Sequence, residues 1–444
     1  MSHTEDLMMA TKRQDWRRWL GRGAWAVADQ GLFALSSALL NILLARWLVP
    51  LQYGAFAVAY SVFLFIGACH TALFTEPMLV FGSDRYALRL SGYMRVLVRG
   101  HWMLTGMGSL LLVFAGVICW LKGAGVSAQI SLGLAVATPF TLLLWLMRRA
   151  SYVRLQPHLA TAASAIYFIL VMTGLLTLNY CEEISVLSVM LSMGLSSAVA
   201  GLWLRWRLCA QAVIDAADAE RPAQRAVLLD HWNYGRWALA TSILMWVPLN
   251  FYFIVLSGWV SLEASATLKA LTNLVLPLLQ ANAALSALLV PSLVMRAGNT
   301  VAFRHLLRSA LSLFFAGAVL YALFIGTLGR PLVHLLYGGK YDGSASLLWL
   351  LALLPVLDGM AVVFASALRS LEHPNLVFWA NLYAAACVLT MGIWATSRWR
   401  LAGAASGIVL ADMLAVAVLG LSVYMCLRPV RRALKTPAAN LARS

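Results

Sequence analysis

The sequence predicts an all-α membrane protein with about 12 transmembrane helices, arranged as two six-helix lobes with a central cavity. The prediction rests on the composition, the number of long apolar stretches and the placement of the basic residues. Of the 444 residues, 62% are hydrophobic and 11% are charged, whereas soluble globular proteins have roughly 45–50% apolar and about 25% charged residues. So little polar surface excludes a soluble enzyme, a disordered protein and a nucleic-acid-binding domain, despite the net charge of +16.

Twelve stretches are long and apolar enough to cross a bilayer, which requires about 20 mostly apolar residues each. They are 24–46, 53–74, 101–121, 125–147, 160–179, 183–204, 237–258, 264–292, 304–327, 345–369, 375–395 and 401–427. Helices are the expected architecture because irregular backbone in lipid leaves its polar groups unsatisfied. The stretch 264–292 is long enough for one tilted helix with a kink at Pro277.

The basic residues test this topology because cytoplasmic loops carry an excess of Lys and Arg. With an even number of spans, both termini lie on the same side of the membrane. That side receives all but seven of the 33 Lys and Arg residues. The seven on the opposite side are Arg46, Lys122, Lys269, Arg330, Lys340, Arg398 and Arg400. We therefore expect a multi-pass protein of the inner (cytoplasmic) membrane with both termini in the cytoplasm.

A polar stretch at 205–235 divides the chain after the sixth span and separates two related halves. Trp47 and Pro77 in the first half correspond to Trp259 and Pro291 in the second, and Pro77 is expected to end the second span. Six crossings return the chain to its starting side, so the halves are expected to be related by an axis along the membrane normal. The predicted parts are a cytoplasmic tail at 1–22, an N-lobe at 23–204, an inter-lobe loop at 205–235, a C-lobe at 236–427 and a cytoplasmic tail at 428–444.

Three acidic residues within the predicted spans are candidates for ion coupling. An acidic residue at the centre of a membrane helix costs about 2.5–3.5 kcal/mol on insertion scales, so it is a functional candidate. Asp29 lies near the inner end of the first span, and Asp358 and Asp412 lie near the middle of the tenth and twelfth. Those two spans run in the same direction, which places Asp358 and Asp412 at a similar depth. Together they are expected to hold a proton or a sodium ion.

Structural roles remain open for these acids. Asp29 is close enough to Arg18 and Arg22 to pair with either of them. The two C-lobe acids could each bond to a helix neighbour such as Asn381 or Tyr383.

Two groups of polar residues at helical spacing are candidate substrate-binding residues. They are Gln30, Ser37 and Asn41 on the first span and Lys269, Asn273 and Gln280 on the eighth. Each group repeats on one helix face, although Asn, Gln and Ser in membrane helices also bond to neighbouring helices. Likewise, His70 in the second span is either a functional residue or a packing residue.

No motif for covalent chemistry or nucleotide binding occurs in the sequence. The six cysteines do not form the closely spaced pairs of a metal site. The protein is therefore expected to be no enzyme and to use no cofactor or metal, and a gradient is the expected energy source. Its positive charge is explained by loops that contact anionic lipid, so nucleic acid is not an expected partner.

The first two spans carry a recognisable pattern. Residues 29–79 begin with the polar Asp29, continue through Ala45-Arg46-Trp47-Leu48 and Pro50, and open the second span at Tyr53-Gly54. This segment resembles the first two helices of polysaccharide flippases of the multidrug/oligosaccharidyl-lipid/polysaccharide (MOP) exporter superfamily. The twelve spans, the two lobes and the basic C-terminal tail agree with that resemblance.

The resemblance implies a bundle like that of the MATE transporters and a function in flipping. The substrate would be an isoprenoid-diphosphate-linked oligosaccharide, moved from the inner to the outer leaflet by alternating access for a surface or exported polysaccharide. Membrane lipid and a polysaccharide polymerase or glycosyltransferases are the implied partners. Basic residues of such flippases meet the diphosphate; here Lys269 is the best candidate, and Arg22 and Arg236 flank the inner mouth. Few other basic residues lie within the spans, which departs from the pattern.

Other functions remain open from the sequence. A proton- or sodium-coupled multidrug exporter of the same superfamily and a non-transporting scaffold of a polysaccharide assembly complex have the same architecture. Another secondary transporter is a further alternative, since 82–89 partly resembles the Gly-Asp-Arg-Arg loop of major-facilitator transporters.

Overall fold

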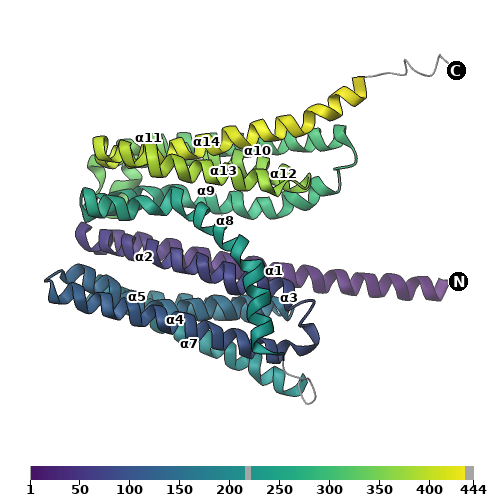
Figure 1. Ribbon diagram of the computed structural model, residues 1–444, viewed down its shortest axis with the longest axis horizontal. Helices are drawn as coiled ribbons and strands as arrows, with labels where there is room; N and C mark the ends of the chain where they lie inside the picture. Colours follow the sequence, from purple (N-terminus) through teal and green to yellow (C-terminus); the bar gives the residue numbers. More distant parts are fainter. Residues whose placement is uncertain (1, 216–221, 436–444) are drawn as a thin grey trace. The chain divides into compact units, whose positions relative to one another are not determined.

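The computed structural model describes residues 2–215 and 222–435, and the side chains of 21–210, 222–286 and 288–427 (Figure 1). Parts of the predicted tails and of the inter-lobe loop therefore lie outside the described residues. Within those ranges the regular structure is helical, with no strand. The chain divides into two compact units, Met1–Ile243 and Leu244–Ser444, and each is described by itself.

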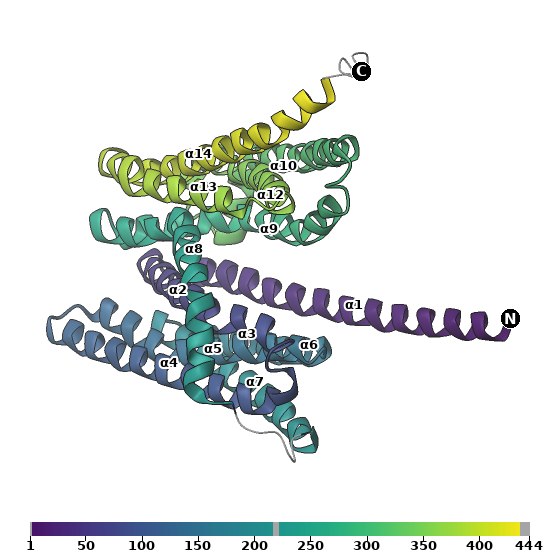
Figure 2. The same ribbon diagram turned by 45° about the vertical axis from the view of Figure 1, so that its right-hand side comes forward.

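The first unit contains long helices joined by short connections. Its elements are α1 (Ser2–Trp47), α2 (Pro50–His70), the π-helical turn η1 (Thr71–Thr75), α3 (Glu76–Phe81), the 3₁₀ turn η2 (Ala87–Arg89), α4 (Leu90–Leu121), α5 (Gly125–Val153), α6 (Pro157–Tyr180), α7 (Val186–Asp215) and the first part of α8 (Gln224–Trp259). Figures 1 and 2 show α5 beside α4 and α7. Glycines allow the close approach of α7 to α5: a Cβ on Gly194 would lie 3.0 Å from the Cα of Ala137. Small residues at such contacts are typical of membrane helices, whose association depends on close van der Waals packing.

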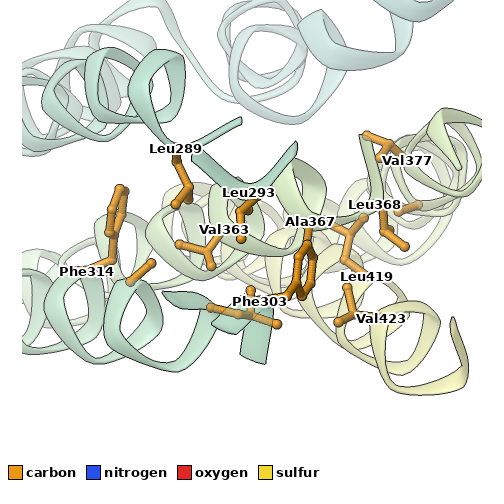
Figure 3. Close-up of a cluster of buried hydrophobic side chains, with 13 residues drawn as sticks. Leu289, Leu293, Phe303, Phe314, Val363, Ala367, Leu368, Val377, Leu419 and Val423 are labelled. Carbon is orange, nitrogen blue, oxygen red and sulfur yellow. The ribbon is translucent and has the colours of Figure 1, made fainter. Parts of the chain in front are cut away.

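The second unit contains the rest of α8 and the C-terminal helices. They are α9 (Leu262–Val294), α10 (Thr300–Tyr337), the 3₁₀ turn η3 (Asp342–Leu347), α11 (Leu348–Leu351), α12 (Leu354–Ser370), α13 (Pro374–Cys387), the π-helical turn η4 (Val388–Gly392) and α14 (Ile393–Lys435). A hydrophobic core cluster joins five of these helices: Leu289 and Leu293 from α9, Phe303 and Phe314 from α10, Val363, Ala367 and Leu368 from α12, Val377 from α13, and Leu419 and Val423 from α14 (Figure 3).

Local sequence signals set several helix ends in the second unit. Ser261 accepts a hydrogen bond from the Ala264 amide before α9, and Asn299 accepts two from the first turn of α10. Side chains of this type satisfy amides that a helix N-terminus otherwise leaves unpaired. α10 ends where Gly338 adopts a left-handed conformation with φ 64°, which glycine takes without a steric penalty.

Eleven helices of the described chain are long and apolar enough to cross a membrane. The last of these, 374–427, contains a reversal: Arg400 is non-helical, and Gly403 and Gly407 pack against Ala395 and Gly392. It therefore comprises two antiparallel segments, which correspond to the eleventh and twelfth predicted stretches. The chain is an all-α multi-pass membrane protein, as its composition predicts.

Two details differ from the sequence-based expectations. Pro77 does not end the second span: the helix continues through η1 and α3 to Phe81, and the π-helical turn accommodates a proline that cannot donate an amide hydrogen bond. The stretch 205–235, expected as a loop, is helical up to Asp215 and from Gln224 onward. The first part of α8 belongs to the first unit, so the boundary between units lies at Ile243.

Candidate functional site

A buried ion pair lies within the first unit. The Arg148 guanidinium on α5 donates to both carboxylate oxygens of Asp29 on α1, from Nε to Oδ1 at 3.0 Å and from Nη2 to Oδ2 at 2.9 Å. The Tyr152 hydroxyl donates to Oδ2 at 2.6 Å, and the Ser164 hydroxyl on α6 donates to Oδ1 at 2.5 Å. Asp29 is 0% exposed and Arg148 7%. Such two-pronged contacts are among the strongest hydrogen bonds in proteins, and these join three helices.

This arrangement identifies the partner of Asp29. The guanidinium of Arg148 also lies 4.2 Å from the centre of the Phe33 ring, a distance at which a cation and an aromatic face attract each other. Arg22, an expected partner, is exposed on α1, and the side chain of Arg18 lies outside the described residues. Sequence reasoning missed Arg148 because this residue follows an apolar stretch and therefore resembles a basic residue of a loop. In the structure α5 continues to Val153, and Arg148 is one of its buried residues.

A cavity of about 190 Å³ adjoins the ion pair. Its lining residues are Asp29, Gln30, Phe33, Thr71, Thr75, Trp145, Arg148, Arg149 and Tyr152. Gln30, one of the predicted substrate contacts, is exposed on this lining, as is Arg149. Glu76 lies within electrostatic range of Arg149. The cavity therefore combines hydrogen-bonding groups with two guanidinium groups that each have a carboxylate nearby, a set suited to a polar ligand.

The other predicted residues of the first span have packing contacts. The Ser37 hydroxyl lies 3.3 Å from the Tyr60 hydroxyl of α2. Asn41 is buried and donates from Nδ2 to the Ser37 carbonyl at 2.8 Å. Of the three predicted residues on this helix, only Gln30 lines the cavity.

Histidines surround the π-helical turn η1 that contributes Thr71 and Thr75 to the cavity. His70 Nε2 lies 3.0 Å from His101 Nδ1 on α4, and neither side chain is exposed. On the other side of the turn, His231 Nδ1 lies 2.9 Å from the carbonyl oxygen of Leu73. His70 is thus half of a pair, whereas the sequence singled it out alone, because its partner lies on another helix.

The loop 82–86 contacts the start of α8 within the first unit. Arg85 donates to Asp230 Oδ1 at 2.8 Å, and the Tyr86 hydroxyl donates to Oδ2 at 2.6 Å. Burial, together with the hydrogen bond to the Asp230 carboxylate, raises the pKa of Tyr86 to about 12. The Tyr93 hydroxyl lies 2.6 Å from His231 Nε2. These contacts explain why the first part of α8 belongs to the first unit.

The second unit buries a cation. Lys269 on α9 is 6% exposed, and its ammonium lies 5.5 Å from the centre of the Phe253 ring. Asn273, one turn along the helix, is also buried, and the Tyr337 hydroxyl donates to the Ala270 carbonyl at 2.9 Å beside it. Gln280 is exposed. The predicted polar face of the eighth span therefore separates into two buried members and one exposed member.

Asp358 and Asp412 lie near one another in the second unit. Asp358 on α12 and Asp412 on α14 are half-buried and within electrostatic range of each other. Asn282 on α9 donates from Nδ2 to Asp358 Oδ2 at 2.9 Å. Asn381, a suggested partner of these acids, instead donates to the Val377 carbonyl of its own helix. Asn282 was missed because only the packing of α9 against α12 brings it to Asp358.

Among the described residues, no group of three or more His, Cys, Asp or Glu side chains could hold a metal ion.

Comparisons with known proteins agree with this architecture. No protein-family model matches the chain, and no curated protein matches its sequence. The inward-facing structure of a multidrug resistance MATE family transporter of the MOP superfamily is similar, with a TM-score of 0.76 and 14% identity, covering 93% of this chain and 100% of that one. The inward closed lipid II flippase MurJ gives a TM-score of 0.68 and 13% identity, covering 90% and 87% of the two chains.

A MOP superfamily transporter from Pyrococcus furiosus gives a TM-score of 0.59 and 13% identity, covering 93% of this chain and 95% of that chain. These three neighbours are transporters or flippases rather than enzymes. At such low identity the likeness concerns the fold. The chain is a multi-pass membrane protein with the fold of the MOP superfamily transporters.

Proposed function

We propose that this protein is an alternating-access transporter that flips an isoprenoid-diphosphate-linked oligosaccharide from the inner to the outer leaflet of the cytoplasmic membrane. The observation that carries the proposal is a cation buried inside a helical unit, Lys269 of the second unit. A charged residue at such a position is costly and usually functional, and a cation favours an anionic substrate. The fold shared with a lipid II flippase supports the same class of cargo.

The predicted site residues take two roles in this proposal. Lys269 meets the diphosphate, because an ammonium binds phosphate oxygens as a point charge. Asn273, Gln280, Gln30, Ser37 and Asn41 supply hydrogen-bonding groups for the glycan or for the helix contacts that shape its path. Arg149 joins them as a second cation, since it lines the same cavity as Gln30.

Ion coupling is assigned to Asp358 and Asp412, with Asp29 as a further acid. Two nearby carboxylates resist simultaneous ionisation, so a proton or sodium ion bound there changes the charge of the second unit. Asp29 acts through Arg148: neutralising its carboxylate would release the guanidinium from a bond that joins α1 and α5. Exchange of the bound ion would then bias the inward- and outward-open states.

Deletion of the gene tests the proposed cargo. We expect loss of one surface or exported polysaccharide and accumulation of lipid-linked repeat units in the inner leaflet, restored by the wild-type gene. Normal polysaccharide with altered drug sensitivity would contradict the proposal and would favour a coupled drug exporter. That second candidate is supported by the fold shared with a multidrug resistance MATE family transporter.

Transport by the purified protein distinguishes a flippase from a scaffold. Proteoliposomes containing the protein and a short fluorescent lipid-linked oligosaccharide should expose the glycan to a membrane-impermeant reagent in the opposite leaflet. Liposomes with the Lys269→Met variant are the control, because methionine has a similar length without the charge. Equal exposure with and without protein would show that the protein does not move this substrate.

Polysaccharide assembly enzymes remain the proposed partners.

A further inference from the structure

A second cavity of about 240 Å³ in the first unit carries four arginines. Arg95 and Arg99 come from α4, Arg154 directly follows α5, and Arg205 comes from α7. No carboxylate is among the described residues that line it. Arg154 and Arg205 are half-buried, whereas Arg95 and Arg99 are exposed. Four guanidinium groups line one small space, and an anion placed among them would be attracted by all four.

This four-arginine pocket is separate from the cavity of the Asp29–Arg148 ion pair. The two spaces share α5 but use different faces of its last turns. Met147 and Ala150 line the four-arginine pocket, whereas Trp145, Arg148 and Tyr152 line the other cavity. A ligand in the four-arginine pocket therefore does not need the residues assigned to transport.

Most of the remaining lining is apolar. Met94, Val98, Met147, Ala150 and Leu208 supply aliphatic surface, and Ser91 and Cys209 complete the lining. A site for a free inorganic ion would more commonly present polar groups on all sides. A lining of guanidinium groups and aliphatic side chains suits a molecule with a charged head and an apolar body.

Beyond the pocket, exposed apolar side chains form a stripe along α4. Met103, Met107 and Leu110 follow Arg99 at helical spacing, and all three are largely exposed, at 69%, 60% and 72%. Residues three or four apart lie on the same side of a helix. An acyl chain whose headgroup lies between the arginines would therefore extend along the exposed side of α4.

We propose that the four-arginine pocket binds the phosphate headgroup of an anionic phospholipid of the cytoplasmic leaflet. Guanidinium groups bind phosphate oxygens in a two-pronged manner, and basic pockets between transmembrane helices on the cytoplasmic side hold lipids of this class. Four cations balance the charge of two phosphates better than the charge of a single phosphate. A phospholipid with two phosphates, such as cardiolipin, is therefore the preferred ligand. The bound lipid would brace α4, α5 and α7.

Native mass spectrometry of the full-length protein released from detergent tests the proposal. Cardiolipin should remain bound at concentrations at which phosphatidylethanolamine, a zwitterionic lipid, does not. The double variant Arg99→Gln/Arg205→Gln should bind cardiolipin roughly tenfold more weakly, which corresponds to a loss of about 1.4 kcal/mol of binding free energy. The charge-preserving Arg99→Lys/Arg205→Lys should retain most of the binding. Arg207→Gln on α7, whose side chain stacks near Trp206 outside the pocket, is the matched control and should bind like wild type.

Several outcomes would overturn the proposal. Equal cardiolipin binding by Arg99→Gln/Arg205→Gln and wild type would remove the pocket as the site, provided that circular dichroism shows both proteins folded. Binding of inorganic diphosphate as tightly as cardiolipin would assign the pocket to a soluble anion. Stronger binding of an isoprenyl diphosphate than of cardiolipin would assign it to the transported substrate. None of these measurements depends on transport activity, so they stand apart from the proposed function.

Discussion

His70 and His101 form a buried pair, with Nε2 of the first 3.0 Å from Nδ1 of the second. They join α2 to α4 directly before the π-helical turn η1, and the His70 ring stacks on Phe74 with ring centres 4.9 Å apart. A hydrogen bond between two neutral imidazoles needs one proton between the two nitrogens. Each ring therefore supplies the hydrogen-bond partner of one buried nitrogen of the other.

The pair predicts non-additive stability changes. His70→Leu or His101→Leu alone should lower the free energy of unfolding by about 1–3 kcal/mol, because each leaves a buried polar group unpaired. The double variant His70→Leu/His101→Leu should cost less than the sum, because it leaves no orphan imidazole. Thermal unfolding in detergent measures this, with the exposed His158→Leu on α6 as the control. Strictly additive losses would contradict an energetic coupling between the rings.

The Asp29–Arg148 ion pair predicts a similar asymmetry with larger magnitude. Removing one charge, as in Arg148→Gln, leaves the other buried without a counterion and should cost about 3–5 kcal/mol. Asp29→Asn/Arg148→Gln should recover part of that loss. The quantity to measure is the melting temperature together with the amount of folded protein in the membrane. An Arg148→Gln protein as stable as wild type would mean that the pair contributes little.

Asp358 and Asp412 predict the dependence of transport on an ion gradient. Asp358→Asn and Asp412→Asn should each remove most of the stimulation by an imposed pH or sodium gradient, because an amide neither ionises nor attracts a cation. Transport in proteoliposomes, with and without each gradient, measures the effect. Glu263→Gln, at an exposed position in the first turn of α9, is the control. Unchanged gradient dependence in both Asp variants would exclude the pair as the coupling site.

The burial of Lys269 predicts that transport requires a positive charge at this position. Lys269→Ala should lower transport without lowering the amount of folded protein, whereas Lys269→Arg should retain more activity, because phosphate accepts either cation. Initial rates of transport of the lipid-linked oligosaccharide provide the measurement. Wild-type rates in both variants would leave Lys269 with a packing role against Phe253 alone.

The arrangement of the spans predicts the sidedness of the loops. Reporter fusions after residues 90, 215 and 435 should all lie in the cytoplasm, and a fusion near residue 340 should lie outside. The reason is the excess of Lys and Arg near the first three positions. A cytoplasm-specific enzyme and a periplasm-specific enzyme at the same positions provide complementary signals. An external signal at 215 would require an odd number of crossings in the first half.

Much of the fold follows from the sequence because hydropathy is a local property. A run of about 20 apolar residues crosses a bilayer whatever its neighbours are, so the helical class and the number of crossings were predictable. The same holds for the helix ends at Ser261 and Asn299, where a side chain caps amides within its own turn. Asp358 and Asp412 were recognisable as neighbours because both depth and helix direction follow from counting spans.

Other features depend on partners that are distant in the chain. Arg148 lies 119 positions from Asp29, and His101 lies 31 positions from His70. Pairings at such separations depend on which helix faces pack together, which no local pattern specifies. The π-helical turns η1 and η4 also escaped sequence reasoning.

The sequence by itself determined that this protein is a membrane-embedded helical bundle, because burying its apolar stretches in lipid requires nothing beyond the stretches themselves. Only the tertiary structure decided which charged residues form ion pairs and which line cavities. An arginine near the end of an apolar stretch has the same local sequence signal in each case. Its role depends on whether packing turns it toward Asp29, as in Arg148, or toward a ring of other arginines, as in Arg99 and Arg205.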